Sequence, residues 1–231
     1  MVPLRDNNPT TITPYVTYGL IAANILVFLY QLSLSPQELQ GLFQIAALVP
    51  CQISDTCPSG LSNPLIPEWL TLVTSQFLHG GFLHLAGNML FLWVFGNNIE
   101  DKLGHIKYLI FYLLCGVLAA LSQWFFSQNS TIPALGASGA IAGVLGAYIF
   151  RFPKSQILTL IPLGFFWTTI RLPALFFLGF WFFQQAFYGI ASLQARSNIG
   201  MESGGVAYWA HAGGFVFGVV LAPLFGLYKR R

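Results

Sequence analysis

Four polar residues, His84, Asn88, Ser138 and His211, interrupt apolar stretches of this 231-residue chain. A serine hydroxyl becomes a nucleophile when a neighbouring imidazole accepts its proton. Backbone N–H groups at the start of a helix, and the amide of an asparagine, can stabilise the negative oxygen that forms when a serine attacks a carbonyl group. These residue types together therefore indicate acyl-transfer chemistry, with Ser138 as the nucleophile and His211 as its base.

Each of these residues also has an ordinary structural interpretation. A serine in an apolar helix usually bonds to its own backbone, and a single buried histidine is more often a packed residue than a catalyst. Asn88 can simply join two helices through a hydrogen bond. The chemical interpretation therefore depends on whether the chain brings the four residues to one place.

The composition indicates a polytopic membrane protein. Only 7% of the residues are charged, 55% are hydrophobic, and the mean hydropathy is +0.67. A typical soluble domain has about 25% charged residues, and a soluble globule of this size needs more charge than this to cover its surface. These numbers exclude a cytosolic enzyme, a nucleic-acid binder and a disordered chain.

Apolar segments between the charged residues predict six membrane-spanning helices. The expected fold class is an all-α, polytopic membrane helical bundle that forms a single domain over residues 1–231. The spans are expected at about 15–34, 82–99, 108–126, 138–150, 172–193 and 204–228, with an outer loop at 35–81.

Two segments do not fit a simple span. Ser138–Phe150 has 13 residues, or about 20 Å of helix against a hydrocarbon core of about 30 Å. Either this helix continues past Arg151, or the preceding loop enters the membrane, where irregular backbone must be buried in protein or line a wet cavity. Ser155–Ile170 is apolar but is broken by Pro162 and Gly164, so we expect an interfacial or re-entrant segment.

The positive charges predict the orientation. Nine of the ten Lys and Arg residues fall on one side of the predicted spans, and only Arg196 falls on the other. Such a bias marks the cytoplasmic side, so both termini are expected to be cytoplasmic. The second, fourth and sixth spans then run from outside to inside, which places all four polar candidates in the outer third of the membrane. His211 is expected about eight residues, or roughly 12 Å, into its span.

Small residues predict how the fourth and sixth spans pack. Gly139 and Gly143 lie four residues apart in one span, and Gly214 and Gly218 do so in the other. Such pairs allow helices to approach closely, and if the two faces meet, the serine and histidine candidates come together. All acidic residues lie outside the spans, so the expected catalytic unit is a Ser–His dyad without a carboxylate.

Three motifs resemble those of the rhomboid family of intramembrane serine proteases. They are HGGFLHLAGN at His79–Asn88, GASG at Gly136–Gly139 and AHAGGFVFG at Ala210–Gly218. The resemblance extends over all six predicted spans, in the same order and topology. It implies a six-span, bacterial-type member in a prokaryotic cell membrane.

The resemblance also implies the role of each site residue. Ser138 would be the nucleophile and His211 the general base and then the general acid. Asn88, His84 and the backbone N–H of Ser138 would form the oxyanion hole. The supporting positions would be His79, Gly136, Gly139, Gly214 and Gly218.

The implied activity is cleavage of the transmembrane segments of other membrane proteins near their outer ends. Water would come from an internal cavity, and substrates would arrive through the bilayer beside the fifth span, where Phe176–Tyr188 is rich in aromatic residues. No cofactor, metal ion or nucleic-acid partner is expected, and the oligomeric state is left open.

The sequence departs from the family pattern in two places. Some members carry an aromatic residue one turn after the nucleophile, stacked on the base, where this chain has Ala142. Many members have Arg after a tryptophan of the first loop, where Trp69 is here followed by Leu70. The group that orients the base is therefore left open.

The sequence leaves two alternatives to the protease function, and one alternative for the cysteines of the outer loop. A catalytically inactive rhomboid-like binding module is the main alternative. A small-solute transporter or channel is less well supported. Transporters often carry ionisable residues at the membrane midplane, whereas the predicted spans of this chain have none below the outer third. Cys51 and Cys57 can form a disulfide in an oxidising exterior, and a zinc site shared with His79 is the alternative for these cysteines.

Overall fold

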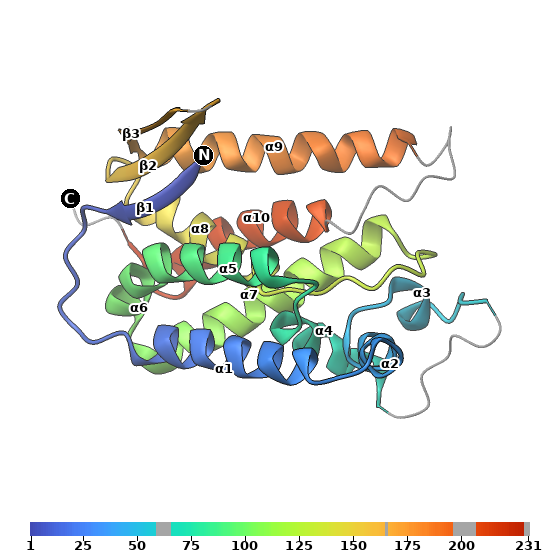
Figure 1. Cartoon of the computed structure of the whole chain (residues 1–231). Helices are drawn as coiled ribbons and strands as arrows, with labels where there is room; N and C mark the ends of the chain where they lie inside the picture. Colours follow the sequence, from blue (N-terminus) through green and yellow to red (C-terminus); the bar gives the residue numbers. More distant parts are fainter. Residues whose placement is uncertain (59–65, 165, 196–206, 229–231) are drawn as a thin grey trace.

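The computed structural model describes residues 1–58, 66–164, 166–195 and 207–228 (Figure 1). Most of these residues are helical, which confirms the predicted class of a membrane helical bundle. The α-helices among them are α1 (Tyr15–Leu32), α2 (Pro36–Ala46), α3 (Pro50–Ile53), α4 (Thr71–Thr74), α5 (Phe82–Phe91), α6 (Asn97–Leu103), α7 (His105–Phe126), α8 (Ser138–Arg151), α9 (Ala174–Ala195) and α10 (Tyr208–Leu224). A π-helical stretch, Leu92–Gly96, joins α5 to α6.

Apolar helices lie at the positions of the six predicted spans, but their lengths differ. In the described residues, α1, α7 and α9 are long and apolar enough to cross a membrane. A fourth candidate is a bent pair of helical segments, Glu68–Phe77 and Phe82–Leu103, which meet at 83°. Because α8 and α10 are shorter, the count of six spans stays a prediction.

The boundaries of the two short helices correct two expectations. Helix α8 ends at Arg151, so the alternative in which this helix continues is wrong. Helix α10 begins at Tyr208, which places His211 in its first turn rather than about eight residues in. The expected start of the sixth span at 204–206 lies outside the described residues, as do Arg196 and residues 229–231.

A three-stranded antiparallel sheet is an addition to the expected all-α fold. Its strands are β1 (Val2–Asp6), β2 (Gln156–Leu163) and β3 (Phe166–Pro173), in the order β1-β2-β3. Pro162 pairs with Trp167 near the hairpin turn, where Gly164 has a φ of 64°. The break at these residues is therefore a hairpin rather than a re-entrant loop. The helix of the expected fifth span, α9, starts at Ala174 rather than at position 172, because β3 runs to Pro173.

Helix α8 lies at the centre of the bundle. Ten of its 14 residues are buried, and it packs against α7, α9 and α10. A Cβ atom on Gly214 would clash with the carbonyl oxygen of Gly139, and one on Gly218 would clash with that of Gly143. The two predicted small-residue faces therefore meet, and backbone approaches backbone along the contact.

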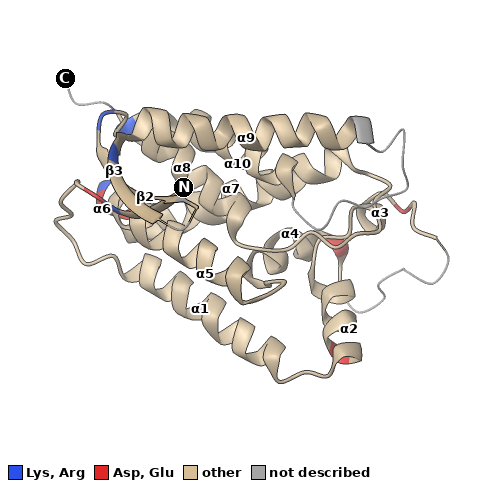
Figure 2. Ribbon diagram, turned by 45° about the horizontal axis from the view of Figure 1, so that its top comes forward, with Lys and Arg blue, Asp and Glu red and all other residues tan. Residues whose placement is uncertain are grey.

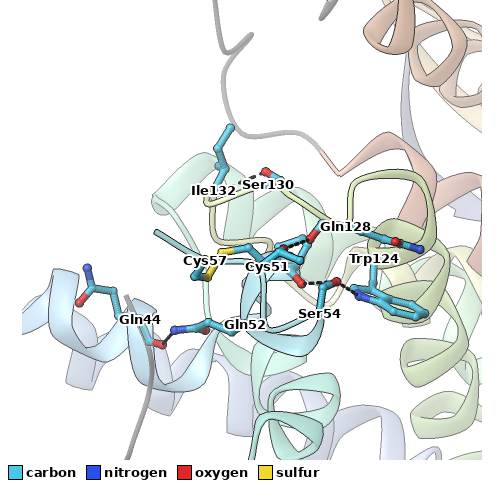
Figure 3. The surroundings of a disulfide bond; sticks show 11 residues. Gln44, Cys51, Gln52, Ser54, Cys57, Trp124, Gln128, Ser130 and Ile132 are labelled. Carbon is cyan, nitrogen blue, oxygen red and sulfur yellow. Dashed lines mark hydrogen bonds between the residues drawn. A yellow bond between two sulfur atoms is a disulfide. The ribbon is translucent and has the colours of Figure 1, made fainter. Parts of the chain in front are cut away.

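The segment between α1 and α5 packs on the loop that leads into α8. Leu48 and Ala134 form a two-way backbone bridge, with N–O distances of 3.0 and 2.7 Å. Cys51 and Cys57 form a disulfide, which excludes the zinc site. Beside it, the backbone N–H of Cys51 donates to the carbonyl oxygen of Ser130 (Figure 3). The disulfide region thus holds the irregular chain before Ser138 in place.

Charged residues separate the two ends of the molecule. Figure 2 shows Lys and Arg gathered at the end that carries the sheet and α6, whereas the charged residues coloured on α2 and on the chain around α3 and α4, at the other end, are acidic. The N-terminal strand β1 is part of the sheet at this basic end (Figure 1). Among the described residues, the one-sided charge pattern expected from the sequence is therefore present in three dimensions.

Candidate active site

Ser138 is the first residue of α8, and His211 lies in the first turn of α10. The Oγ atom of Ser138 lies 2.7 Å from the Nε2 atom of His211. The sequence separates the two residues by 73 positions, and the contact between the glycine faces of α8 and α10 brings them together. This is the distance at which a serine hydroxyl can pass its proton to an imidazole.

The other nitrogen of His211 is also bonded. Its Nδ1 atom lies 2.7 Å from the Oε1 atom of Gln185 on α9. The ring of Trp181, one turn before Gln185, lies 5.8 Å from the imidazole at an angle of 35°. An aromatic ring therefore does lie beside His211, but it comes from α9 and not from the position of Ala142, which is fully buried.

Asn88 on α5 is held by His79, one of the predicted supporting residues. The Nδ2 atom of Asn88 lies 2.9 Å from Nε2 of His79, and both side chains are buried. The backbone of His79 is fixed in turn by Gln31 of α1, whose side-chain amide exchanges two hydrogen bonds with it, of 2.7 and 3.0 Å. Because an amide nitrogen carries two hydrogens, the bond to His79 leaves Asn88 a second one to donate.

His84 faces the same loop as Asn88. Its Nδ1 atom accepts a hydrogen bond of 3.4 Å from the backbone N–H of Gly80. Its Nε2 atom would lie 2.7 Å from a Cβ atom placed on Gly136, and Nδ2 of Asn88 would lie 3.5 Å from the same point. Gly136 has a φ of 125° and no room for a side chain. The loop before Ser138 therefore passes directly over the two predicted oxyanion donors.

The start of α8 offers further donors. Helix α8 has no side-chain cap at its N-terminus, and the first N–H groups of a helix have no partner within it. The N–H of Gly136 is already used, since it donates to the carbonyl oxygen of Ser75 at 2.9 Å. An oxyanion next to Ser138 would thus face the helix N-terminus on one side and the Asn88 and His84 side chains on the other.

A small cavity of about 30 Å³ lies beside Ser138. Ser75, Gln76 and Gln123 contribute its polar lining. The Oε1 atom of Gln76 is buried without a hydrogen-bond partner in the described structure, whereas Oε1 of Gln123 accepts from the backbone N–H of Ala210 at 3.3 Å. A polar cavity of this size can hold water, and an orphaned amide oxygen gives that water a partner.

The rhomboid domain family model matches residues 67–228, a range that contains all three motifs and both halves of the Ser–His pair. The chain belongs to the rhomboid family. Its match to "Rhomboid protease GluP" of Bacillus subtilis is 32% identical over 219 residues. A second match, to "Rhomboid protein 1, mitochondrial" of Saccharomyces cerevisiae, is 29% identical over 164 residues.

These rhomboid relatives are longer proteins. The match covers 94% of this chain but only 36% of the Bacillus protein, and 69% of this chain but 43% of the yeast protein. A human relative, "Presenilin-associated rhomboid-like protein, mitochondrial", is 30% identical over 60% of this chain and 33% of its own length. This chain therefore spans less than half the length of each of these relatives.

Reasoning from the sequence missed three amides and one aromatic of this rhomboid site. Gln185, Gln76, Gln123 and Trp181 were not predicted as site residues. A signal was available for Gln185, because polar residues within an apolar span are costly and usually face the bundle interior. The neighbouring Gln184 hides that signal, since adjacent residues point to different faces of a helix.

Proposed function

We propose that this chain is an intramembrane serine endopeptidase with Ser138 as nucleophile and His211 as base. The observation that carries the proposal is the 2.7 Å contact between Ser138 Oγ and His211 Nε2 at the first residue of a buried helix. Family membership supports the same activity, because the Bacillus relative is named a rhomboid protease.

The first half of the reaction uses the Ser–His pair directly. Ser138 Oγ gives its proton to His211 Nε2 as it attacks the carbonyl carbon of the peptide bond. The carbonyl oxygen becomes negative and accepts hydrogen bonds from Asn88, His84 and the backbone N–H of Ser138. The protonated His211 then donates to the leaving amine, which leaves an acyl group on Ser138.

The second half requires a water molecule. The cavity beside Ser138 and its unpaired Gln76 oxygen provide a place for that water within the bundle. His211 accepts a proton from the water molecule as the water oxygen attacks the acyl carbon. The second negative oxygen is stabilised by the same three donors, Asn88, His84 and the backbone N–H of Ser138. Ser138 Oγ then recovers a proton from His211, and the acid product is released.

The substrates in this proposal are transmembrane segments of other proteins in the same bilayer. The basic end of the molecule faces the cytoplasm of a prokaryotic cell by the positive-inside rule, with both termini on that side. The N-terminal ends of α8 and α10, which carry the dyad, are then nearer the outer surface. Cleavage is therefore expected near the outer end of the substrate helix.

A fluorophosphonate probe tests this function, because it reacts covalently only with an activated serine. The wild-type protein in lipid should be labelled at Ser138, and Ser138→Ala and His211→Ala should not be labelled. The matched control is Ser122→Ala, because Ser122 donates to the backbone of its own helix at Leu118 and labelling should persist. An unlabelled wild type would favour the inactive binding module.

A further inference from the structure

The structure assigns a positioning role to Gln185: its amide oxygen fixes the tautomer of His211 that can accept the proton of Ser138. This inference rests on the proposed function and extends it to a third residue. Gln185 lies on α9, whereas Ser138 and His211 lie on α8 and α10. Three separate helices therefore meet at the imidazole.

The two hydrogen bonds of the imidazole are compatible with only one arrangement of protons. The Oε1 atom of Gln185 is an acceptor, so the 2.7 Å contact to Nδ1 requires a proton on Nδ1. A neutral imidazole carries one proton, so Nε2 has a free lone pair. That lone pair faces Ser138 Oγ at 2.7 Å. The other tautomer would place a proton on Nε2 and disable the base.

Gln185 replaces the carboxylate of a triad with a neutral group. In serine proteases with a triad, a buried aspartate holds the imidazole in the correct tautomer, and the amide analogue that inverts this hydrogen bond loses about 10⁴-fold in kcat. A carboxylate within a membrane span would be costly to bury. An amide oxygen accepts the same hydrogen bond at much lower desolvation cost.

Trp181 supports the same ring from one turn away. Its ring lies 5.8 Å from that of His211, within the range at which an aromatic face attracts a cation. Trp181 and Gln185 are four residues apart, so they share one face of α9. On that face, Gln185 holds the His211 ring through Nδ1. Trp181 stabilises the positively charged imidazolium that forms during the reaction.

Gln184 provides a matched control for Gln185. It is the adjacent residue, has the same side chain, and is likewise half-buried on α9. Since adjacent helix residues point in different directions, Gln184→Leu should change the apolar character of the helix as much as Gln185→Leu does, without removing the acceptor of His211. A difference between the two variants thus reports on the bond to the imidazole.

The kinetic test compares cleavage of a single-span substrate by four proteins in the same liposomes. We expect Gln185→Leu to lower kcat by about 10- to 100-fold, less than the loss known for a charged orienting residue, with KM nearly unchanged. Gln185→Glu retains an acceptor and should recover most of the rate. Gln184→Leu should match the wild type. An unchanged kcat in folded Gln185→Leu would overturn the assignment.

The spectroscopic test does not depend on any variant's activity. In protein labelled with ¹⁵N-histidine, the His211 signals are assigned by their loss in His211→Asn. The wild type should show a protonated Nδ1 and an unprotonated Nε2, and Gln185→Leu should show a shift toward the other tautomer. A wild-type spectrum with the proton on Nε2 would overturn the assignment even if no Gln185 variant folds.

Ser138→Ala in the same cleavage assay separates this inference from the proposed function. If Ser138→Ala is inactive while Gln185→Leu cleaves like the wild type, the protease assignment stands and the role of Gln185 is wrong. If Ser138→Ala still cleaves specifically, the serine mechanism itself fails, and the tautomer of His211 loses its catalytic meaning.

Discussion

At the scale of single residues, Asn88 separates a catalytic donor from a structural bond. Its amide contacts His79 at 2.9 Å and has a second hydrogen directed elsewhere. If that hydrogen binds the oxyanion, Asn88→Ala should lower kcat by about 10²- to 10³-fold with little change in KM, since the charge develops only in the transition state. Steady-state cleavage kinetics measure both constants.

The control for Asn88→Ala is Asn24→Ala. Asn24 is also a buried asparagine of an apolar helix, but its Nδ2 donates to Leu20 of the same helix at 2.8 Å. This variant should keep its kcat. Interhelical hydrogen bonds in membranes average only about 0.6 kcal/mol, so Asn88→Ala should lower the melting temperature only slightly. A full kcat combined with a much lower melting temperature would instead show that Asn88 is a packing residue.

How much of the site the sequence predicts depends on what each residue contacts. Ser138, His211, Asn88 and His84 are polar residues inside predicted spans, and the structure brings them around one loop. The sequence does not identify Gln185 as a site residue, because its contact with His211 depends on the rotation of α9 about its own axis. The sequence places two adjacent glutamines in that helix, and only the packed structure shows which of them reaches His211.

At the scale of elements, the contact between α8 and α10 sets the distance between nucleophile and base. A Cβ atom on Gly214 would meet the backbone carbonyl of Gly139, which cannot rotate away as a side chain can. Gly214→Ala should therefore push the helices apart and lower stability by about 1–3 kcal/mol. A misplacement of about 1 Å at the reacting atoms is enough to lower the rate by about 10²-fold.

Gly179→Ala is the matched control for this packing prediction. Gly179 lies within α9, and a Cβ atom there would meet nothing within 4 Å. Alanine is also the better helix former, by about 1 kcal/mol. Thermal unfolding and cleavage should therefore be unchanged or slightly improved in Gly179→Ala. Equal losses in the two variants would contradict close packing as the cause.

The sheet links the N-terminal segment to the far end of α8. The hydroxyl of Tyr148 donates to Asp6 at 2.6 Å and accepts from the side chain of Asn8 at 2.6 Å. Burial raises the pKa of the Asp6 carboxyl above its ordinary value, although the hydrogen bonds from Tyr148 and Asn8 oppose this shift. Burial therefore opposes the ionisation of Asp6 in the folded protein.

This shift predicts a pH dependence of stability. A carboxyl whose pKa is higher in the folded state contributes stability at low pH, and that contribution is lost as the pH rises through the folded pKa. Asp6→Asn keeps an acceptor for Tyr148 and removes the titration. Its melting temperature should exceed that of the wild type at neutral pH, and the difference should shrink on acidification. A lower melting temperature for Asp6→Asn at neutral pH would contradict this reading.

The sheet also shows which elements sequence patterns could not predict. Strand β1 pairs with β2 across more than 150 positions of sequence, and no local pattern reports such a pairing. Pro162 and Gly164 looked like breaks in an apolar helix, whereas they lie at a hairpin end. The helices were predictable because their apolar runs are local. The start of α10 was not, because apolar residues precede it.

At the scale of the whole molecule, the charge pattern predicts an orientation. Gln40 on α2 and Lys154 before β2 are both exposed, at opposite ends of the molecule. In intact bacterial cells, a membrane-impermeant maleimide should label Gln40→Cys directly. It should label Lys154→Cys only after the membrane is opened, because the basic end faces inside. The reverse pattern would invert the topology and move the dyad toward the cytoplasmic half.

The most direct test of the whole account is cleavage of a single-span protein in proteoliposomes, with the cut mapped by mass spectrometry. Wild type should cut near the outer end of the substrate helix, because the dyad lies at the N-terminal ends of α8 and α10. Ser138→Ala, His211→Ala and the double variant should be equally inactive, since the pair acts as a unit. The same cut made by purified Ser138→Ala would contradict the mechanism.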